Sequence, residues 1–191
     1  TLTMSATGAT LHTLRLLLSS AANRVLLGSD LTVNNTFSLT GGGIDLNAND
    51  LFLNGNLVLP ASNASAGLFG NTNSLLHITA TTVTGQLQFN SGANSLSGLV
   101  LAGGNLTVGS SLVIVDSVAV HGGVLSSNGN IELNADVSGK ARVGLIHTAN
   151  AILGNLIVET HISGGNTGWM HLGVSGVENQ TVADWDTYAS S

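Results

Sequence analysis

Over positions 1–135, apolar residues recur in pairs two positions apart, and short runs of Asn, Gly, Ser and Thr separate the pairs. In a strand every second side chain lies on the same face, so this alternation indicates β-strands with one buried face. The intervening residues are disfavoured inside helices and favoured in turns, which argues against helix. The pattern predicts an all-β fold, with apolar pairs at Val25/Leu27, Leu31/Val33, Phe37/Leu39, Ile44/Leu46, Leu51/Leu53 and Leu57/Leu59.

The spacing of these pairs distinguishes between all-β folds. Successive pairs begin six or seven residues apart, whereas strict sixes would be typical of a left-handed hexapeptide helix. The drift favours a right-handed parallel β-helix (β-solenoid) with three short strands and about 20 residues per coil. Stacking such coils about 4.8 Å apart joins their inward residues into a continuous core. A β-sandwich also uses many short alternating strands and is the main alternative.

An internal repeat supports the solenoid. The stretch 24–54 recurs loosely as 105–134, and an offset of 81 aligns Leu27 with Val108. The two copies share apolar pairs, which we expect inside, and glycines, which we expect with asparagines at corners that need positive φ. The inward rows are predicted to hold Leu, Val, Ile and Phe. The outward rows are predicted to include Thr32, Ser38, Asp45, Phe52, Thr107 and Val113.

Two regions depart from the repeating pattern. The segment 63–73 is rich in Ser, Asn and Gly and follows Pro60, the only proline, so we predict a loop that protrudes from the solenoid. Both tryptophans and the only tyrosine fall within 169–188, close to the end of the chain. We therefore predict solenoid repeats over 1–135, and over 136–191 a C-terminal cap or the start of another β domain.

Composition narrows the classes of function. Four basic residues and a net charge of −6 offer no basic patch, so we expect no nucleic-acid partner. No apolar run reaches the roughly 18 residues of a membrane helix, so no membrane insertion is expected. The absence of cysteine excludes disulfides and thiolate metal sites. The opening TLTMSATGATL has no charged n-region or apolar h-region, so we interpret the chain as a fragment whose secretion signal lies elsewhere.

The order of motifs resembles that of a known family. TVTGQLQFNSGANSLSGLVLAGGNLTVGSSL (82–112) and VAVHGGVLSSNGNIELNADVSGKARVG (118–144) are similar to repeats of large secreted surface proteins of Bacteroidota. Those repeats carry "G-x-L-x-F-x-G", "L-T-V-x-G-x-L-x-L" and "S-G-x-A-R-V-G" in this order. NLIVETHISGGNTGWMHLGVSGVENQTVADW (155–185) is similar to the block that follows in the same proteins. Two arginines of that block are replaced here, by Thr160 and Met170, so no ion-pair role carries over to them.

The resemblance implies a cell-surface or released protein that the type IX secretion system exports, with a C-terminal sorting domain outside this chain. Family members resemble adhesins, including those of gliding motility, so surface polysaccharides or other surface proteins are the implied partners. We therefore expect an extracellular, non-catalytic structural or adhesive module that acts as a stiff spacer or adhesin stalk. The alternatives are a polysaccharide-binding or polysaccharide-processing β-helix protein, and secretion cargo captured with its translocon.

Candidate catalytic chemistry is sparse. A polysaccharide-processing β-helix needs several carboxylates on one outward face, and the best local pairs are Asp45 with Asp50 and Glu132 with Asp136. The first pair does not recur in the repeat, so turn and solvated-face roles are favoured. The six histidines show no i, i+4 pairing, and GGGIDL (41–46) lacks the third glycine of the calcium-binding nonapeptide. We predict no enzyme activity, no cofactor and no metal site.

Two features carry functional hypotheses. Asp116-Ser117-Val118 matches the short Asp-Ser/Thr-apolar sequence on which Bacteroidota attach O-glycans, so Ser117 is a candidate O-glycosylation site predicted to face outward. Trp169 and Trp185 are candidates for carbohydrate stacking, because an aromatic ring offers a sugar a broad apolar face. Packing within a cap or a domain junction is the favoured alternative for the two tryptophans.

Overall fold

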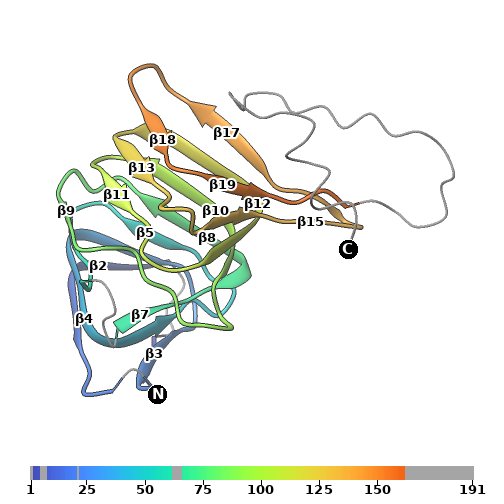
Figure 1. Ribbon diagram of the computed structural model, residues 1–191. Helices are drawn as coiled ribbons and strands as arrows, with labels where there is room; N and C mark the ends of the chain where they lie inside the picture. The colour runs from blue at the N-terminus through green and yellow to red at the C-terminus, as the bar shows by residue number, and fades with distance from the viewer. Residues whose placement is uncertain (1, 5–7, 21, 62–65, 162–191) are drawn as a thin grey trace, which may run out of the picture. The chain divides into compact units, whose positions relative to one another are not determined.

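The computed structural model describes residues 2–4, 8–20, 22–61 and 66–161. All regular secondary structure in these residues is β-strand (Figure 1). These residues form no helix that is long and apolar enough to cross a membrane. The strands are β1 (Leu2–Met4), β2 (Ala9–Leu17), β3 (Arg24–Leu27), β4 (Leu31–Asp45), β5 (Leu51–Leu53), β6 (Asn56–Val58), β7 (Ala66–Phe69), β8 (Asn71–Ile78), β9 (Val83–Thr84), β10 (Ser95–Ala102), β11 (Leu106–Thr107), β12 (Leu112–Gly122), β13 (Val124–Ser126), β14 (Ile131–Leu133), β15 (Ala135–Asp136), β16 (Gly139–Lys140), β17 (Arg142–Ile146), β18 (Ala151–Leu153) and β19 (Leu156–Val158).

The strands stack in parallel, each on a strand of the preceding turn of chain (Figure 1). The longest path runs β1-β3-β4-β5-β8-β10-β12-β14-β19. Among the strand pairs of the described residues, β15 with β16 is the antiparallel exception, a short hairpin beside the stack. The predicted parallel β-solenoid is therefore confirmed. The β-sandwich alternative is wrong, because a sandwich is built from antiparallel sheets.

Two columns of inward side chains run through seven successive strands and form the centre of the core. Because parallel partners lie in register, each inward residue stacks on the inward residue of the previous coil. The residues in the middle of both columns are fully buried. One column is Ala9, Leu31, Leu51, Leu76, Leu99, Val118 and Val143, and the other is Leu11, Val33, Leu53, Ile78, Leu101, Val120 and Ile146.

Coil length varies more than the spacing of apolar pairs indicates. The chain makes a short turn from Leu96 to its stacked partner Ile114, but a much longer one from Leu125 to its partner Ile152. Register shifts between β10 and β12 also change the length of the turn within this one pair of strands. The prediction of about 20 residues per coil therefore describes a mean around which the corners expand and contract.

The outward rows and the corners are occupied as predicted. The side chains predicted to point outward, including Thr32 and Thr107, are half-buried on the strand faces. At the corners, Asn47 and Asn128 have φ of 48° and 52°. Ala48 also adopts φ of 63°, although its Cβ disfavours the left-handed region. Corner geometry therefore overrides residue preference at that position.

The prediction of a protruding loop over 63–73 is wrong for its described part. Residues 66–69 form β7 and residues 71–78 form β8, and both strands belong to the stack. Gly67 pairs with Gly43 of β4, and Leu68 beside it is 1% exposed. Small residues typical of loops are used here because the chain passes close to its neighbours.

Stacked coils continue beyond the predicted solenoid limit at residue 135. β17, β18 and β19 each pair in parallel with a strand of the preceding coil. Their inward residues are more exposed, since Val143 is 41% and Ile146 is 38% exposed whereas their partners Val118 and Val120 are 0% exposed. Within the described range, no strand stacks on the far side of this last coil. The rest of the predicted cap, 162–191, lies outside the described residues.

Replacing Ser74 by alanine is expected to raise the melting temperature. Ser74 is fully buried, and among the described residues its hydroxyl is the buried side-chain group that makes no hydrogen bond. An unpaired buried hydroxyl costs roughly 1–3 kcal/mol, which alanine would recover apart from a small loss of packing. Thermal unfolding of Ser74→Ala measures the gain.

Ser127 provides the matched control. It is also fully buried, but its hydroxyl donates to the backbone oxygen of Asn155 at 2.7 Å and accepts from the amide of Gly129 at 3.3 Å. Ser127→Ala should therefore lower the melting temperature. If both substitutions lowered it equally, the Ser74 hydroxyl would have to be satisfied in solution.

Candidate functional site

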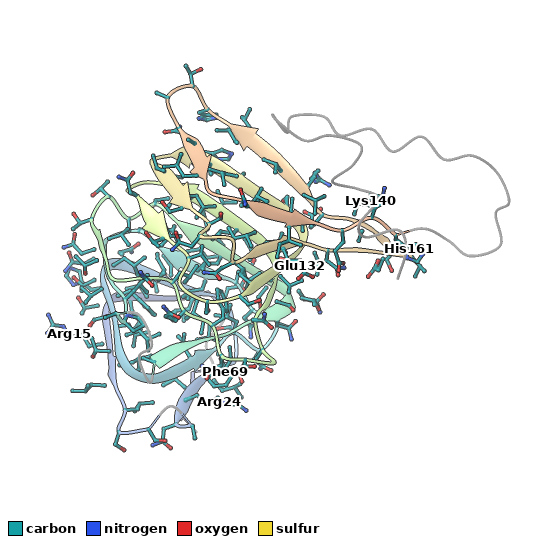
Figure 2. The ribbon with its side chains drawn as sticks, viewed as in Figure 1. Arg15, Arg24, Phe69, Glu132, Lys140 and His161 are labelled. Atoms are coloured by element: carbon teal, nitrogen blue, oxygen red, sulfur yellow. The ribbon has the colours of Figure 1, made fainter. Side chains whose placement is uncertain are left out.

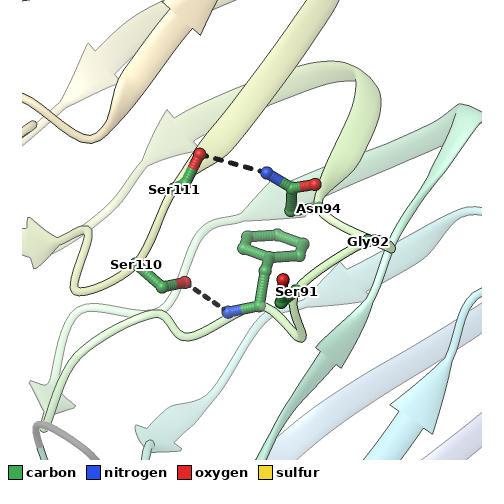
Figure 3. Close-up of a pocket in the computed structure, with 6 residues that line it drawn as sticks. Ser91, Gly92, Asn94, Ser110 and Ser111 are labelled. Atoms are coloured by element: carbon green, nitrogen blue, oxygen red, sulfur yellow. Dashed lines mark hydrogen bonds between the residues drawn. The ribbon is translucent and has the colours of Figure 1, made fainter.

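A surface pocket lies where two successive coils turn a corner (Figure 3). One wall comes from the turn that leads into β10, and the other from the turn between β11 and β12 of the next coil. The pocket has a volume of about 250 Å³. Its lining contains no charged residue and consists of Phe89, Ser91, Gly92, Asn94, Ser110 and Ser111.

Two hydrogen bonds join the walls of the pocket and fix its polar atoms. The amide of Phe89 donates to Ser110 Oγ at 2.6 Å, and Asn94 Nδ2 donates to Ser111 Oγ at 3.1 Å (Figure 3). Both serine oxygens thus act as acceptors, which leaves their hydroxyl hydrogens free to donate. Phe89 supplies the one aromatic ring of the lining. The pocket therefore combines neutral donors and acceptors with an apolar surface.

Other corners of the solenoid are filled by asparagine. Two asparagines, two residues apart, donate their side-chain amides to one backbone oxygen of the preceding coil. This arrangement occurs in both copies of the internal repeat, so it is a structural device that closes the corner. The bonds run from Asn47 and Asn49 to Leu27, and from Asn128 and Asn130 to Val108.

Ser117 lies on an outward position of β12, as predicted. Its hydroxyl donates to Asp116 Oδ2 at 3.2 Å, and Asp116 pairs with Arg142 of the next coil at 3.1 Å. Both ion-pair side chains are mostly exposed, so the pair adds little to stability. The position is half-buried rather than fully open. Its O-glycosylation stays a prediction.

The candidate carboxylate pairs are engaged in local structure. Asp45 pairs with Arg24 at 3.3 Å, and the Arg24 guanidinium lies 4.7 Å from the centre of the Phe69 ring (Figure 2). Asp50 accepts a hydrogen bond from the amide of Leu75 at 2.8 Å. These contacts hold one coil against the next, which agrees with the structural roles favoured for Asp45 and Asp50.

In the second pair, Asp136 accepts hydrogen bonds from the amides of Ser138 and Gly139 in the β15–β16 hairpin. Glu132 occupies an outward position of β14. Within the described residues, no group of three or more His, Asp or Glu side chains converges as metal ligands would.

Histidines gather on one outward face in a way that the sequence did not predict. His121 and His147, from successive coils, stack their rings with centroids 4.8 Å apart and planes at 17°. His77 contacts the Phe52 ring edge-on at 5.9 Å. Burial lowers the pKa of His77 from its ordinary value of 6.5, and the positive charge of His121 lowers it further.

Stability is expected to fall as the pH drops below about 6.5, partly through His77. Because its pKa is lower in the folded protein, the unfolded chain binds the proton first, so acid favours unfolding in this window. We expect His77→Gln to reduce the drop in melting temperature between pH 7.5 and pH 5.5. The exposed His12→Gln is the control for the substitution itself. An unchanged pH dependence in His77→Gln would contradict this assignment.

The sequence did not predict the pocket at Ser110 and Ser111. The available signal is that Ser111 stands in register with Asn130, since Leu112 pairs with Ile131 in the next strand. A short side chain thus replaces the asparagine that closes the repeated corner. Trp169 and Trp185, the candidate carbohydrate-stacking residues, lie outside the described residues.

Comparisons with known proteins add no relative. No protein-family model matches the chain, no curated protein matches it, and no solved structure matches it.

Proposed function

We propose that the chain is a non-catalytic structural or adhesive module of a large secreted bacterial surface protein, acting as a stiff spacer or adhesin stalk. The observation that carries the proposal is the pair of unbroken apolar columns through seven strands. Each coil is fixed to its neighbours by parallel ladders and by this shared core. Bending the stack would break ladder hydrogen bonds and open the shared core, so the fold resists bending.

The dimensions suit a spacer that can be lengthened. Seven stacked strands give six steps, and at about 4.8 Å each they span about 29 Å. Additional coils extend such a stack without a new core design, because each coil contacts only its neighbours. The outward rows are mainly neutral, which suits an extracellular surface that meets other polymers without strong charge repulsion. Export by the type IX secretion system, implied by the sequence resemblance, is part of the proposal.

Single-molecule pulling on the chain between two marker domains tests the spacer role. We expect force peaks that each release roughly one coil, and about 20 residues at about 3.3–3.6 Å each give about 70 Å of new length per peak. Extension without force peaks would contradict a stiff spacer.

Incubation of the chain with bacterial and plant polysaccharides tests the proposal that it is not an enzyme. The appearance of new reducing or unsaturated sugar ends would overturn that proposal.

A further inference from the structure

We infer that the corner pocket bounded by Phe89, Asn94, Ser110 and Ser111 binds one neutral sugar unit. The inference stands independently of the proposed spacer role, because it concerns only the chemistry of this corner. Size is the first argument. At about 250 Å³ the pocket lies just below the roughly 300–1,000 Å³ of sites for drug-sized ligands, so it accommodates a group of about one ring.

The lining selects a neutral, polyhydroxylated ligand. No charged side chain lines the pocket, so ionic ligands gain no partner there. The Ser110 and Ser111 oxygens already accept from Phe89 and Asn94, and their hydroxyl hydrogens can donate outward. Within the described part of the chain, Asn94 Oδ1 makes no hydrogen bond and can accept one. Adjacent sugar hydroxyls, each both donor and acceptor, match this set.

The aromatic ring adds the apolar contact that a sugar uses. Phe89 is 7% exposed, so a small part of its surface is open to solvent. The C–H groups on one face of a pyranose can pack against this apolar surface while the hydroxyls at its edge reach the serines. The Phe89 amide donates a hydrogen bond to Ser110, which holds the Ser110 hydroxyl next to the ring. A sugar needs an apolar surface and a polar group side by side in this way.

The pocket is a local departure from the repeated scaffold. Asn130 donates to a backbone oxygen of the preceding coil at 2.9 Å. The in-register Ser111 has a shorter side chain, which contacts the preceding coil by accepting a hydrogen bond from Asn94 instead. The turn below has Gly92 at φ of 79°, and a Cβ there would meet nothing within 4 Å. The turn at Gly92 is therefore uncrowded where a side chain would project.

Titration of the ¹⁵N-labelled chain with methyl glycosides of glucose, galactose, mannose and N-acetylglucosamine tests the inference. We expect saturable amide shifts confined to 89–94 and 109–111 with at least one of these sugars. Affinity should be weak, with Kd on the order of 1 mM, because few contacts are made. Asn94→Ala should weaken binding by about fivefold, as expected for loss of a hydrogen bond.

Ser111→Asn provides the decisive variant. It introduces the residue that closes the equivalent corner, so we expect a folded spectrum and no sugar-induced shifts at this corner. Ser117→Ala, an outward serine away from the pocket, should bind like the unmodified chain. The inference is overturned if none of the four glycosides shifts these amides, or if Ser111→Asn binds unchanged.

Discussion

Replacing Leu76 by alanine is expected to lower the free energy of unfolding by about 2–5 kcal/mol. Leu76 is 0% exposed and lies in the middle of its column, between Leu51 and Leu99. Truncation removes apolar contacts and leaves a cavity that ladders on both sides keep from collapsing. Equilibrium denaturation in urea, monitored by circular dichroism, measures the change.

Leu17 is the matched control for this truncation. It is 80% exposed although it belongs to strand β2. Leu17→Ala should change the free energy of unfolding by no more than about 0.5 kcal/mol. Equal effects of the two substitutions would mean that Leu76 does not lie in a continuous core.

Gly123→Ala is expected to destabilise the chain by roughly 2–5 kcal/mol, from left-handed strain of about 1–2 and overpacking of about 1–3. Gly123 has φ of 72°, where a Cβ is disfavoured. A Cβ at this position would also press on the backbone oxygens of Gly103 and Gly104 in the preceding coil. Thermal or urea unfolding reports the loss.

Gly129 separates the two contributions. Its φ is 74°, almost the same as that of Gly123, but a Cβ there would meet nothing within 4 Å. Gly129→Ala should therefore cost only the left-handed strain of about 1–2 kcal/mol. If it were as harmful as Gly123→Ala, close approach of the coils at Gly103 and Gly104 would not matter.

The sequence predicts this fold well because the core obeys one local rule. Alternating residues such as Leu51 and Leu53 must point the same way, and the repeat at 105–134 shows that the pattern recurs by coil. Parallel stacking then follows from the need to bury each apolar face. The segment 66–69 does not follow this rule, because its small residues are typical of loops. It forms a strand where Gly67 pairs with Gly43 and lies close to Gln88 of the next coil.

The candidate sites are harder to predict, because they depend on which residues meet across coils. Stacked partners lie a whole coil apart in the sequence and coil length varies, so a pattern within one coil does not place them. The stacking of His121 on His147 and the open corner at Ser111 both require the register. The outward position of Ser117 can be predicted, because it requires only the alternation beside the inward Val118.

Residues about one coil apart stack in parallel, and disulfide formation tests this arrangement most directly. The chain has no cysteine, so an introduced pair is the only one present. Ser38 pairs with Val58, and Val58 pairs with Thr84. Neighbouring strands lie about 4.8 Å apart, inside the Cα range of about 4.4–6.8 Å for disulfides, whereas two coils span about 10 Å and exceed it.

We therefore expect mild oxidation to cross-link the double variant Ser38→Cys/Val58→Cys and to leave Ser38→Cys/Thr84→Cys reduced, as measured by the loss of free thiols in the folded chains. Equal cross-linking of the two variants, or none in the first, would contradict the stack of parallel coils.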